Sequence, residues 1–210
     1  MTPVFLGTLI PLLFLMGLLK NEHRVLVGYF AWGLVAFMAA LAVNTRVVEW
    51  GWIAREELSI HVAPAVEELL KVLPLCAFIL RRRATKRYLI VYYAMASGIG
   101  FSIIENYLYL SQLGGTDGTG MYMVLRSIST ALMHGMATAV VGMGLSFIQE
   151  FHVFVLPIAF GLLSAAITGH SLYNLTVSSA PYHGIAVVIP LALYCLSLPV
   201  IGTLYRREHG

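Results

Sequence analysis

Residues 66–110 read VEELLKVLPLCAFILRRRATKRYLIVYYAMASGIGFSIIENYLYL, and this stretch decides the fold. Two apolar runs flank a short basic segment, and each run is long enough to cross the roughly 30 Å of hydrocarbon in a bilayer as a helix. A segment in lipid must satisfy its own backbone hydrogen bonds, which favours helices over open strands. The stretch therefore predicts two antiparallel membrane helices joined by a basic turn.

The same pattern continues along the rest of the chain. Hydrophobic residues make up 59% of the 210 positions and charged residues only 11%, whereas about 25% of an ordinary soluble domain is charged. We expect an all-α, polytopic transmembrane bundle of about seven spans, forming a single integral membrane domain over residues 1–210. The apolar runs place the spans at 2–20, 25–43, 60–80, 88–111, 121–148, 153–177 and 184–205.

The connectors between these spans differ in charge. With seven spans, nine of the 13 basic residues fall in connectors and tails on one side: Lys20, Arg24, Arg81, Arg82, Arg83, Lys86, Arg87, Arg206 and Arg207. The positive-inside rule makes that side cytoplasmic, so we expect the N-terminus outside and the C-terminus inside a cell (plasma) membrane. These orientation signals account for the net charge of +3, and the pattern excludes nucleic acid as a partner in favour of the lipid bilayer.

Glu67, Glu68, Lys71 and Glu105 lie well within predicted spans, and Arg126 lies in the first turns of another. Each charge near the bilayer centre costs about 2.5–3.5 kcal/mol, so these side chains must face one another, water or a metal. A rise of about 1.5 Å per residue places Glu67, Glu105 and His170 about 9–11 Å below the outer surface. His134 comes out about 20 Å deep, or about 12 Å if its helix begins near Arg126. The similar depths predict one shared site in the outer half of the membrane.

Two hydrolytic schemes fit this set of residues. In the first, Glu67 activates water, with Glu105 or Glu68 as its orienting partner. His170 and Asn174 then donate hydrogen bonds to the oxyanion. In the second, bound water attacks from a divalent metal such as zinc, held by a set of acids and histidines: Glu67 or Glu68, Glu105, His134 and His170. The chain has no HExxH motif, and the first scheme is the preferred expectation.

Four motifs resemble those of a known family. EELLK at 67–71, FSIIEN at 101–106, the lone His134 and HSLYN at 170–174 resemble, in order and spacing, the EExxK, FxxxE, H and HxxxN pattern of PrsW-like proteases. The resemblance covers about residues 60–180, and the wider superfamily includes CAAX prenyl-protein proteases and bacteriocin-processing enzymes. Those prenyl-protein enzymes carry EExxxR and FxxxH, so the lysine and glutamate found here favour the PrsW-like branch.

The resemblance implies an intramembrane or membrane-edge endopeptidase acting on a membrane-anchored protein or peptide. PrsW-like proteins are associated with site-1-type cleavage of membrane-anchored anti-sigma factors, and the family has been described both as glutamic-type and as metal-dependent. The site residues that it implies are Glu67, Glu68, Glu105, His134, His170 and Asn174.

Other interpretations of the same residues remain open. The acids are alternatively structural, paired with Lys71 and Arg126 in buried ion pairs. Asn174 alternatively bonds a neighbouring helix, and we expect Arg126 to snorkel to the outer interface.

Two other functions compete with proteolysis. Facing acids and histidines also build the proton relay of a proton-coupled transporter, although the chain shows neither an internal repeat nor a site at the midplane. A non-catalytic membrane binding protein would retain the same pocket without the chemistry.

Overall fold

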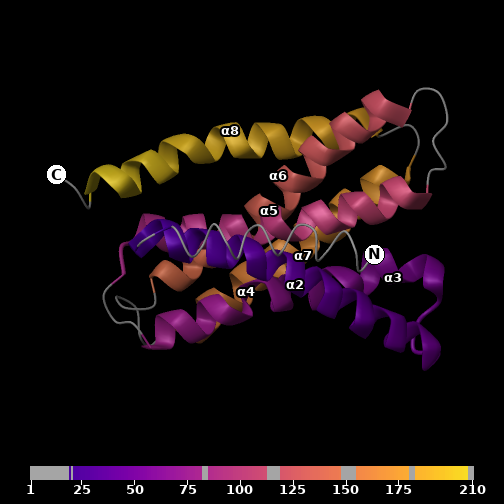
Figure 1. Ribbon diagram of the computed structural model, residues 1–210, viewed down its shortest axis with the longest axis horizontal. Coiled ribbons are helices and arrows are strands. Elements are labelled where there is room, and N and C mark those ends of the chain that lie inside the picture. Colours follow the sequence, from indigo (N-terminus) through magenta and orange to yellow (C-terminus); the bar gives the residue numbers. More distant parts are fainter. Residues whose placement is uncertain are drawn as a thin grey trace.

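The computed structural model describes residues 19, 21–81, 85–112, 119–147, 155–179 and 183–207, and within these ranges the regular structure is helical. Figure 1 shows the long helices gathered into one bundle, with α6 crossing the others obliquely. The predicted all-α bundle is confirmed. The helices are α2 (Asn21–Glu49), α3 (Arg55–His61), α4 (Ala63–Arg81), α5 (Arg87–Gln112), α6 (Thr119–Ser146), α7 (Val155–Ser178) and α8 (His183–Arg207).

The predicted spans match these helices to within a few residues, with one exception. The prediction that α2 ends at residue 43 was wrong, because the helix continues to Glu49 and is followed by the short helix α3. Among the described residues, four helices are long and apolar enough to cross a membrane: α2, α5, α6 from Val124, and α8 from Gly184 to Arg206. The predicted span 2–20 falls outside the described residues except for residue 19.

Helix α5 lies at the centre of the bundle and packs against α2, α4, α6 and α8. Glycines make this close packing feasible, because they have no side chain to separate the helix backbones. A Cβ at Gly98 would collide with the backbone oxygen of His134, and one at Gly100 with the backbone oxygen of Phe30. The backbone of α6 at His134 is therefore held directly against α5.

Pro74 fixes the position of α4. Proline has no N–H, so the carbonyl of Leu70, four residues earlier, lacks its usual partner within the helix. The indole Nε1 of Trp32 on α2 donates to that carbonyl over 2.9 Å. One residue further on, the Ser97 hydroxyl of α5 donates to the carbonyl of Lys71 over 2.9 Å. These two bonds hold the charged part of α4 between α2 and α5.

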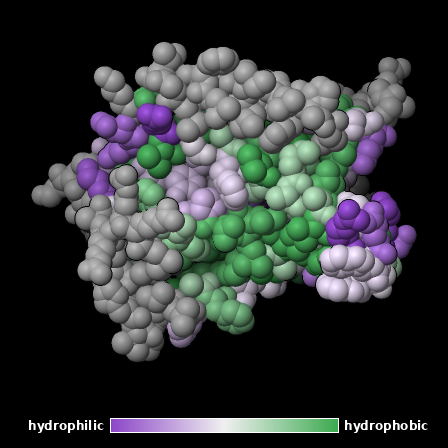
Figure 2. All heavy atoms as spheres, turned by 60° about the horizontal axis from the view of Figure 1, so that its bottom comes forward, coloured by the Kyte–Doolittle hydropathy of each residue, from purple (hydrophilic) through white to green (hydrophobic). Residues whose placement is uncertain are grey.

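The two ends of the bundle differ from its middle. On the face shown in Figure 2, hydrophobic side chains gather centrally and hydrophilic ones at the two ends, which suits a bilayer. The start of α5 meets the end of α8, where the rings of Tyr88 and Tyr205 lie 5.0 Å apart. Along α5, Glu105 lies about 27 Å from Arg87 and about 10 Å from Gln112. Glu105 is therefore displaced away from the basic end of the bundle.

Candidate active site

Polar side chains from four helices meet in the interior. The sequence predicted such a meeting, and the structure brings together Glu67, Glu68 and Lys71 of α4, Glu105 of α5, His134 of α6 and His170 of α7. The rings of His134 and His170 lie edge to face, 4.7 Å apart. Glu68, Lys71 and His134 are completely buried, so they must satisfy one another.

The carboxylate of Glu68 joins α4 to α7. Its Oε1 accepts hydrogen bonds from Lys71 Nζ at 2.6 Å and from His170 Nδ1 at 2.9 Å. Because His170 donates from Nδ1, its Nε2 carries the lone pair in the neutral ring. That nitrogen faces Glu67 Oε2 at 3.7 Å, too far for a hydrogen bond. The buried Oε2 of Glu68 has no hydrogen-bond partner among the described residues.

The carboxylate of Glu105 joins α5 to α6. Lysine only donates hydrogen bonds, so the 2.9 Å contact from Lys71 Nζ makes Nδ1 of His134 an acceptor. Nε2 of that ring then donates to Glu105 over 2.5 Å. Arg126 donates to the second Glu105 oxygen at 3.4 Å, and its guanidinium lies 3.5 Å over the ring of Tyr109. The snorkelling predicted for Arg126 was wrong, because these partners keep it inside and only 6% exposed.

The position of His134 shows why depth along a helix is an imperfect guide. Helix α6 begins at Thr119, so the ring lies about 22 Å along the helix, close to the deeper of the two sequence-based values. It nevertheless contacts Glu105 and Lys71. The oblique course of α6 in Figure 1 explains this, since distance along a tilted helix exceeds depth in the membrane.

The structure contains the buried ion pairs that the alternative interpretation expected. Lys71 pairs with Glu68 and Arg126 pairs with Glu105. Such pairs contribute little net stability, because removing two charges from water offsets their attraction. Glu67 belongs to neither pair, and its side chain is 15% exposed. Glu105 is 17% exposed but pairs with Arg126, so Glu67 is the partly exposed acid of the cluster without a lysine or arginine partner among the described residues.

Asn174 has a different partner from the cluster. Its Nδ2 donates to the backbone oxygen of Ser59 on α3 over 2.8 Å. This contact favours the interpretation in which Asn174 bonds a neighbouring helix over a role at the oxyanion. Helix α3 itself was missed in the sequence, because seven mostly exposed residues carry no apolar periodicity.

Tyr173 makes a further contact that no motif indicated. Its hydroxyl lies 2.9 Å from the Ser129 hydroxyl and 3.1 Å from that of Thr130, and all three residues are buried. These three hydroxyls connect α7 to α6, and Tyr173 lies about one helical turn after His170. The only signal in the sequence is two small hydroxyl residues on one membrane helix and a tyrosine on another, which is too common to be specific.

Three side chains of the cluster are suited to hold a metal ion. One ligand atom each of Glu67, His134 and His170 lies within 4.8 Å of the others. Two imidazoles and one carboxylate form a donor set of catalytic zinc sites, and the Glu68 contact to His170 is the carboxylate support that metal-bound histidines usually have. The donor set fits a metal. The donor set in the structure takes its carboxylate from Glu67. The set expected from the sequence also included Glu68 and Glu105, whose carboxylates are bonded to other side chains of the cluster.

A buried group of two imidazoles and several carboxylates, inside a helical bundle with membrane-length helices, has the ligand and acid–base groups that a membrane-embedded metallohydrolase needs. The chain belongs to the PrsW family of intramembrane metalloproteases, whose family model matches residues 21–201 of the 210. No curated protein and no solved structure matches the chain.

Family membership confirms the predicted class of enzyme, a membrane-embedded protease, over a transporter or a non-catalytic binding protein. The description of the family as metalloproteases also supports the metal scheme, whereas the sequence had favoured water activated by glutamate alone.

Proposed function

We propose that this protease hydrolyses a membrane-anchored protein and that Glu67, His134 and His170 hold a divalent metal such as zinc. The observation that carries the proposal is the approach of their ligand atoms to within 4.8 Å from three different helices. The burial of both histidines supports it, because the only cluster side chains with appreciable exposure in the described residues are the carboxylates of Glu67 (15%) and Glu105 (17%), where water can enter.

When bound, zinc would make water a stronger nucleophile and polarise the scissile carbonyl. Glu68 orients His170 by accepting from Nδ1, which leaves Nε2 directed toward Glu67. To serve as a ligand, His134 must give up one of its two hydrogen bonds, to Lys71 or to Glu105. Giving up the bond to Glu105 would free that carboxylate beside the reacting water.

Glu105 is therefore our candidate for the general base. Its Oε2 already lies 2.5 Å from His134 Nε2, and Arg126 holds its other oxygen. Water adds to the carbonyl carbon while Glu105 takes one of its protons. The C–N bond then breaks, and the same proton passes to the leaving amine. One water is consumed, and once its second proton has also passed from the new carboxyl group to the amine, a carboxylate and an ammonium group are formed.

The place of the site in the bundle bears on where the substrate is cut. Glu105 is displaced from the basic end, which the positive-inside rule makes cytoplasmic. We therefore place the active site in the outer half of a cell membrane, with the C-terminus in the cytoplasm and the N-terminus outside. A cut there would be a site-1-type cleavage, close to the outer surface, in a membrane-anchored substrate.

The proposal is tested by comparing new protein N-termini in membranes of cells that carry the wild type, Glu67→Gln or Glu57→Gln. Glu57 is an exposed acid on α3, so its variant is the matched control. We expect the same cuts with wild type and Glu57→Gln and none with Glu67→Gln. Identical profiles for all three, at equal abundance of folded protein, would contradict the proposed function.

The metal assignment has its own measurement. We expect about one zinc per purified wild-type chain by elemental analysis. His170→Ala should lose most of it, whereas His61→Ala, at an exposed position on α3, should keep it. Full zinc occupancy in His170→Ala would show that the ligand set is different.

A further inference from the structure

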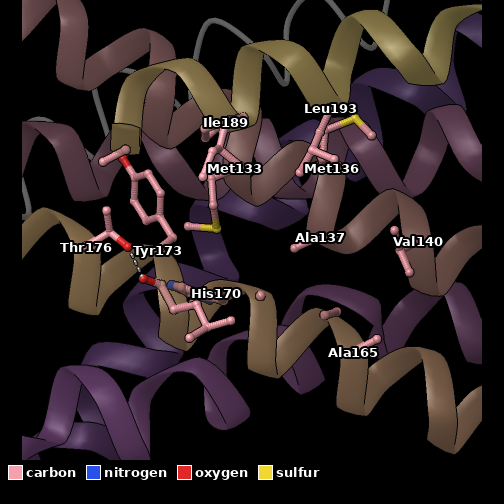
Figure 3. A pocket seen from close by; sticks show the side chains of 15 residues that line it. Met133, Met136, Ala137, Val140, Ala165, His170, Tyr173, Thr176, Ile189 and Leu193 are labelled. Atoms are coloured by element: carbon pink, nitrogen blue, oxygen red, sulfur yellow. Dashed lines mark hydrogen bonds between the residues drawn. The ribbon is translucent and has the colours of Figure 1, made fainter. Parts of the chain in front are cut away.

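A cavity of about 350 Å³ lies between α6, α7 and α8. Its size is within the range of about 300–1,000 Å³ that is usual for ligand pockets. Figure 3 shows Met133 and Met136 of α6 on one wall, Ile189 and Leu193 of α8 above them, and His170 of α7 at the opposite side. The cavity thus extends from one residue of the active site into apolar surroundings.

Apart from Nε2 of His170, which belongs to the candidate metal site, the side-chain polar groups on the walls already have partners. The hydroxyl of Tyr173 bonds Ser129 and Thr130, and that of Thr176 donates to the carbonyl of Leu172 over 2.7 Å. Nδ1 of His170 is held by Glu68. A cavity whose wall hydroxyls are bonded elsewhere favours an apolar occupant, because a polar one would leave its own groups without partners.

We propose that this cavity is the subsite for a large apolar side chain of the peptide substrate, next to the scissile bond. This inference rests on the proposed function. His170 is both a wall of the cavity and a member of the candidate metal site, so an occupant lies against the bond that is cut. A side chain of the cleaved peptide meets that condition directly.

The dimensions favour a side chain over a whole substrate helix. A cavity of about 150 Å³ is enough to bind benzene, and this one has about 350 Å³. It therefore admits a leucine, methionine or phenylalanine side chain with part of its backbone, whereas a helix about 10–12 Å wide does not fit. The substrate segment must be unwound locally, as peptide hydrolysis requires access to the backbone carbonyl.

The cavity is open at its side. Ile189 and Leu193 on α8 and Leu172 on α7 are each about half exposed. In a membrane, that opening between α7 and α8 faces lipid. A substrate anchored in the bilayer could therefore present its side chain without first leaving the membrane.

Gly169 gives a way to fill the cavity selectively. It lines the cavity, and a Cβ added there meets nothing within 4 Å. Leucine at this position should occupy the space without displacing a neighbour, and it is a better helix former than glycine. Gly161 on the same helix is equally open but does not line the cavity, so Gly161→Leu is the matched control.

The test uses purified wild type, Gly169→Leu, Gly161→Leu and Glu67→Gln in lipid nanodiscs with zinc. Each is incubated with a peptide library made from a digested proteome, and mass spectrometry identifies the residues that flank each new cut. We expect wild type and Gly161→Leu to require Leu, Met or Phe at one flanking position. Gly169→Leu should cut such peptides about tenfold less and shift to Ala, Gly or Ser, since each methylene in a pocket changes discrimination about tenfold or more.

The outcomes separate the subsite from the proposed function. Equal absence of cuts with wild type and Glu67→Gln overturns the proposed function and the subsite with it. Cuts by wild type with an unchanged preference in Gly169→Leu overturn the subsite alone. The subsite is also overturned if Gly169→Leu removes a co-purifying phospholipid without altering the cleavage preference, because the cavity then holds lipid.

A second measurement does not depend on the activity or the folding of Gly169→Leu. The peptide that wild type cuts best is resynthesised with photo-leucine at the selected position and irradiated with Glu67→Gln. Cross-links to Met133, Met136 or Leu193 are expected, and a fivefold excess of the unlabelled peptide should suppress them. Labelling confined to residues outside the cavity would overturn the subsite.

Discussion

The imidazole of His170 donates from Nδ1 to Oε1 of Glu68 over 2.9 Å, and this bond joins α7 to α4 inside the bundle. The same oxygen accepts from Lys71, so the carboxylate cannot turn without losing two partners. The bond fixes which nitrogen of His170 faces Glu67. In the proposed site, Glu68 is thus the residue that positions His170, and Glu67 is a metal ligand.

Glu68→Gln should therefore weaken zinc binding. The amide keeps the shape of the side chain but loses the charge that supports His170, and such supporting partners are worth about 10–100-fold in metal affinity. Zinc Kd values from competition with a chromophoric chelator measure the effect, with Glu57→Gln as the exposed control. An unchanged Kd for Glu68→Gln would mean that Glu68 does not position His170.

Removal of metal should stop proteolysis. We expect 1,10-phenanthroline to abolish the cuts that depend on Glu67, and added zinc to restore them, because the donor set Glu67, His134 and His170 needs the metal to activate water. The non-chelating isomer 1,7-phenanthroline should have no effect. Cleavage that persists after elemental analysis shows complete loss of metal would return support to the scheme with glutamate alone.

Gly98→Ala should destabilise the bundle and disturb His134 together. The added Cβ collides with the backbone oxygen of His134, and α5 and α6 must separate to relieve it. Overpacking of this kind costs about 1–3 kcal/mol. Thermal unfolding in detergent and zinc affinity should both fall. Gly202→Ala on α8, where a Cβ meets nothing within 4 Å, is the control and should behave as wild type.

Trp32→Phe tests how α4 is held. The substitution keeps the apolar ring but removes the donor to the Leu70 carbonyl, which Pro74 leaves without a helix partner. An unsatisfied buried carbonyl costs about 1–3 kcal/mol, so the unfolding free energy should fall by that amount. The exposed Trp52→Phe is the control. Equal stability of the two variants in SDS titration would show that the Leu70 carbonyl finds another partner.

Much of the fold was predictable because helix position follows from local composition. Apolar runs of membrane length mark the helices, and those near α5 and α7 were located to within a few residues. Glu67, Glu68 and Glu105 could be identified as site residues because a charged side chain within a membrane span is too costly to face lipid and must face the protein interior. The order of the motifs then indicated the family, which the family model confirms.

The partner of each side chain within the site was less predictable, because it depends on how each helix is rotated and tilted. Glu67 and Glu68 are adjacent in sequence, yet one faces His170 Nε2 and the other holds its Nδ1. Arg126 turns inward because the Tyr109 ring and the Glu105 carboxylate happen to lie within its reach.

By itself, then, the sequence determined that the chain is a helical membrane protein, which of its residues are too polar to face lipid, and hence which of them must meet. Those properties follow from the solvation of each side chain, which is local. Only the tertiary structure decided that Glu67, His134 and His170 form the metal-competent group, that Asn174 instead holds Ser59 of α3, and that a cavity opens beside His170. These depend on distances of a few ångströms between helices, which the crossing angles of α4, α6 and α7 set and which no local pattern encodes.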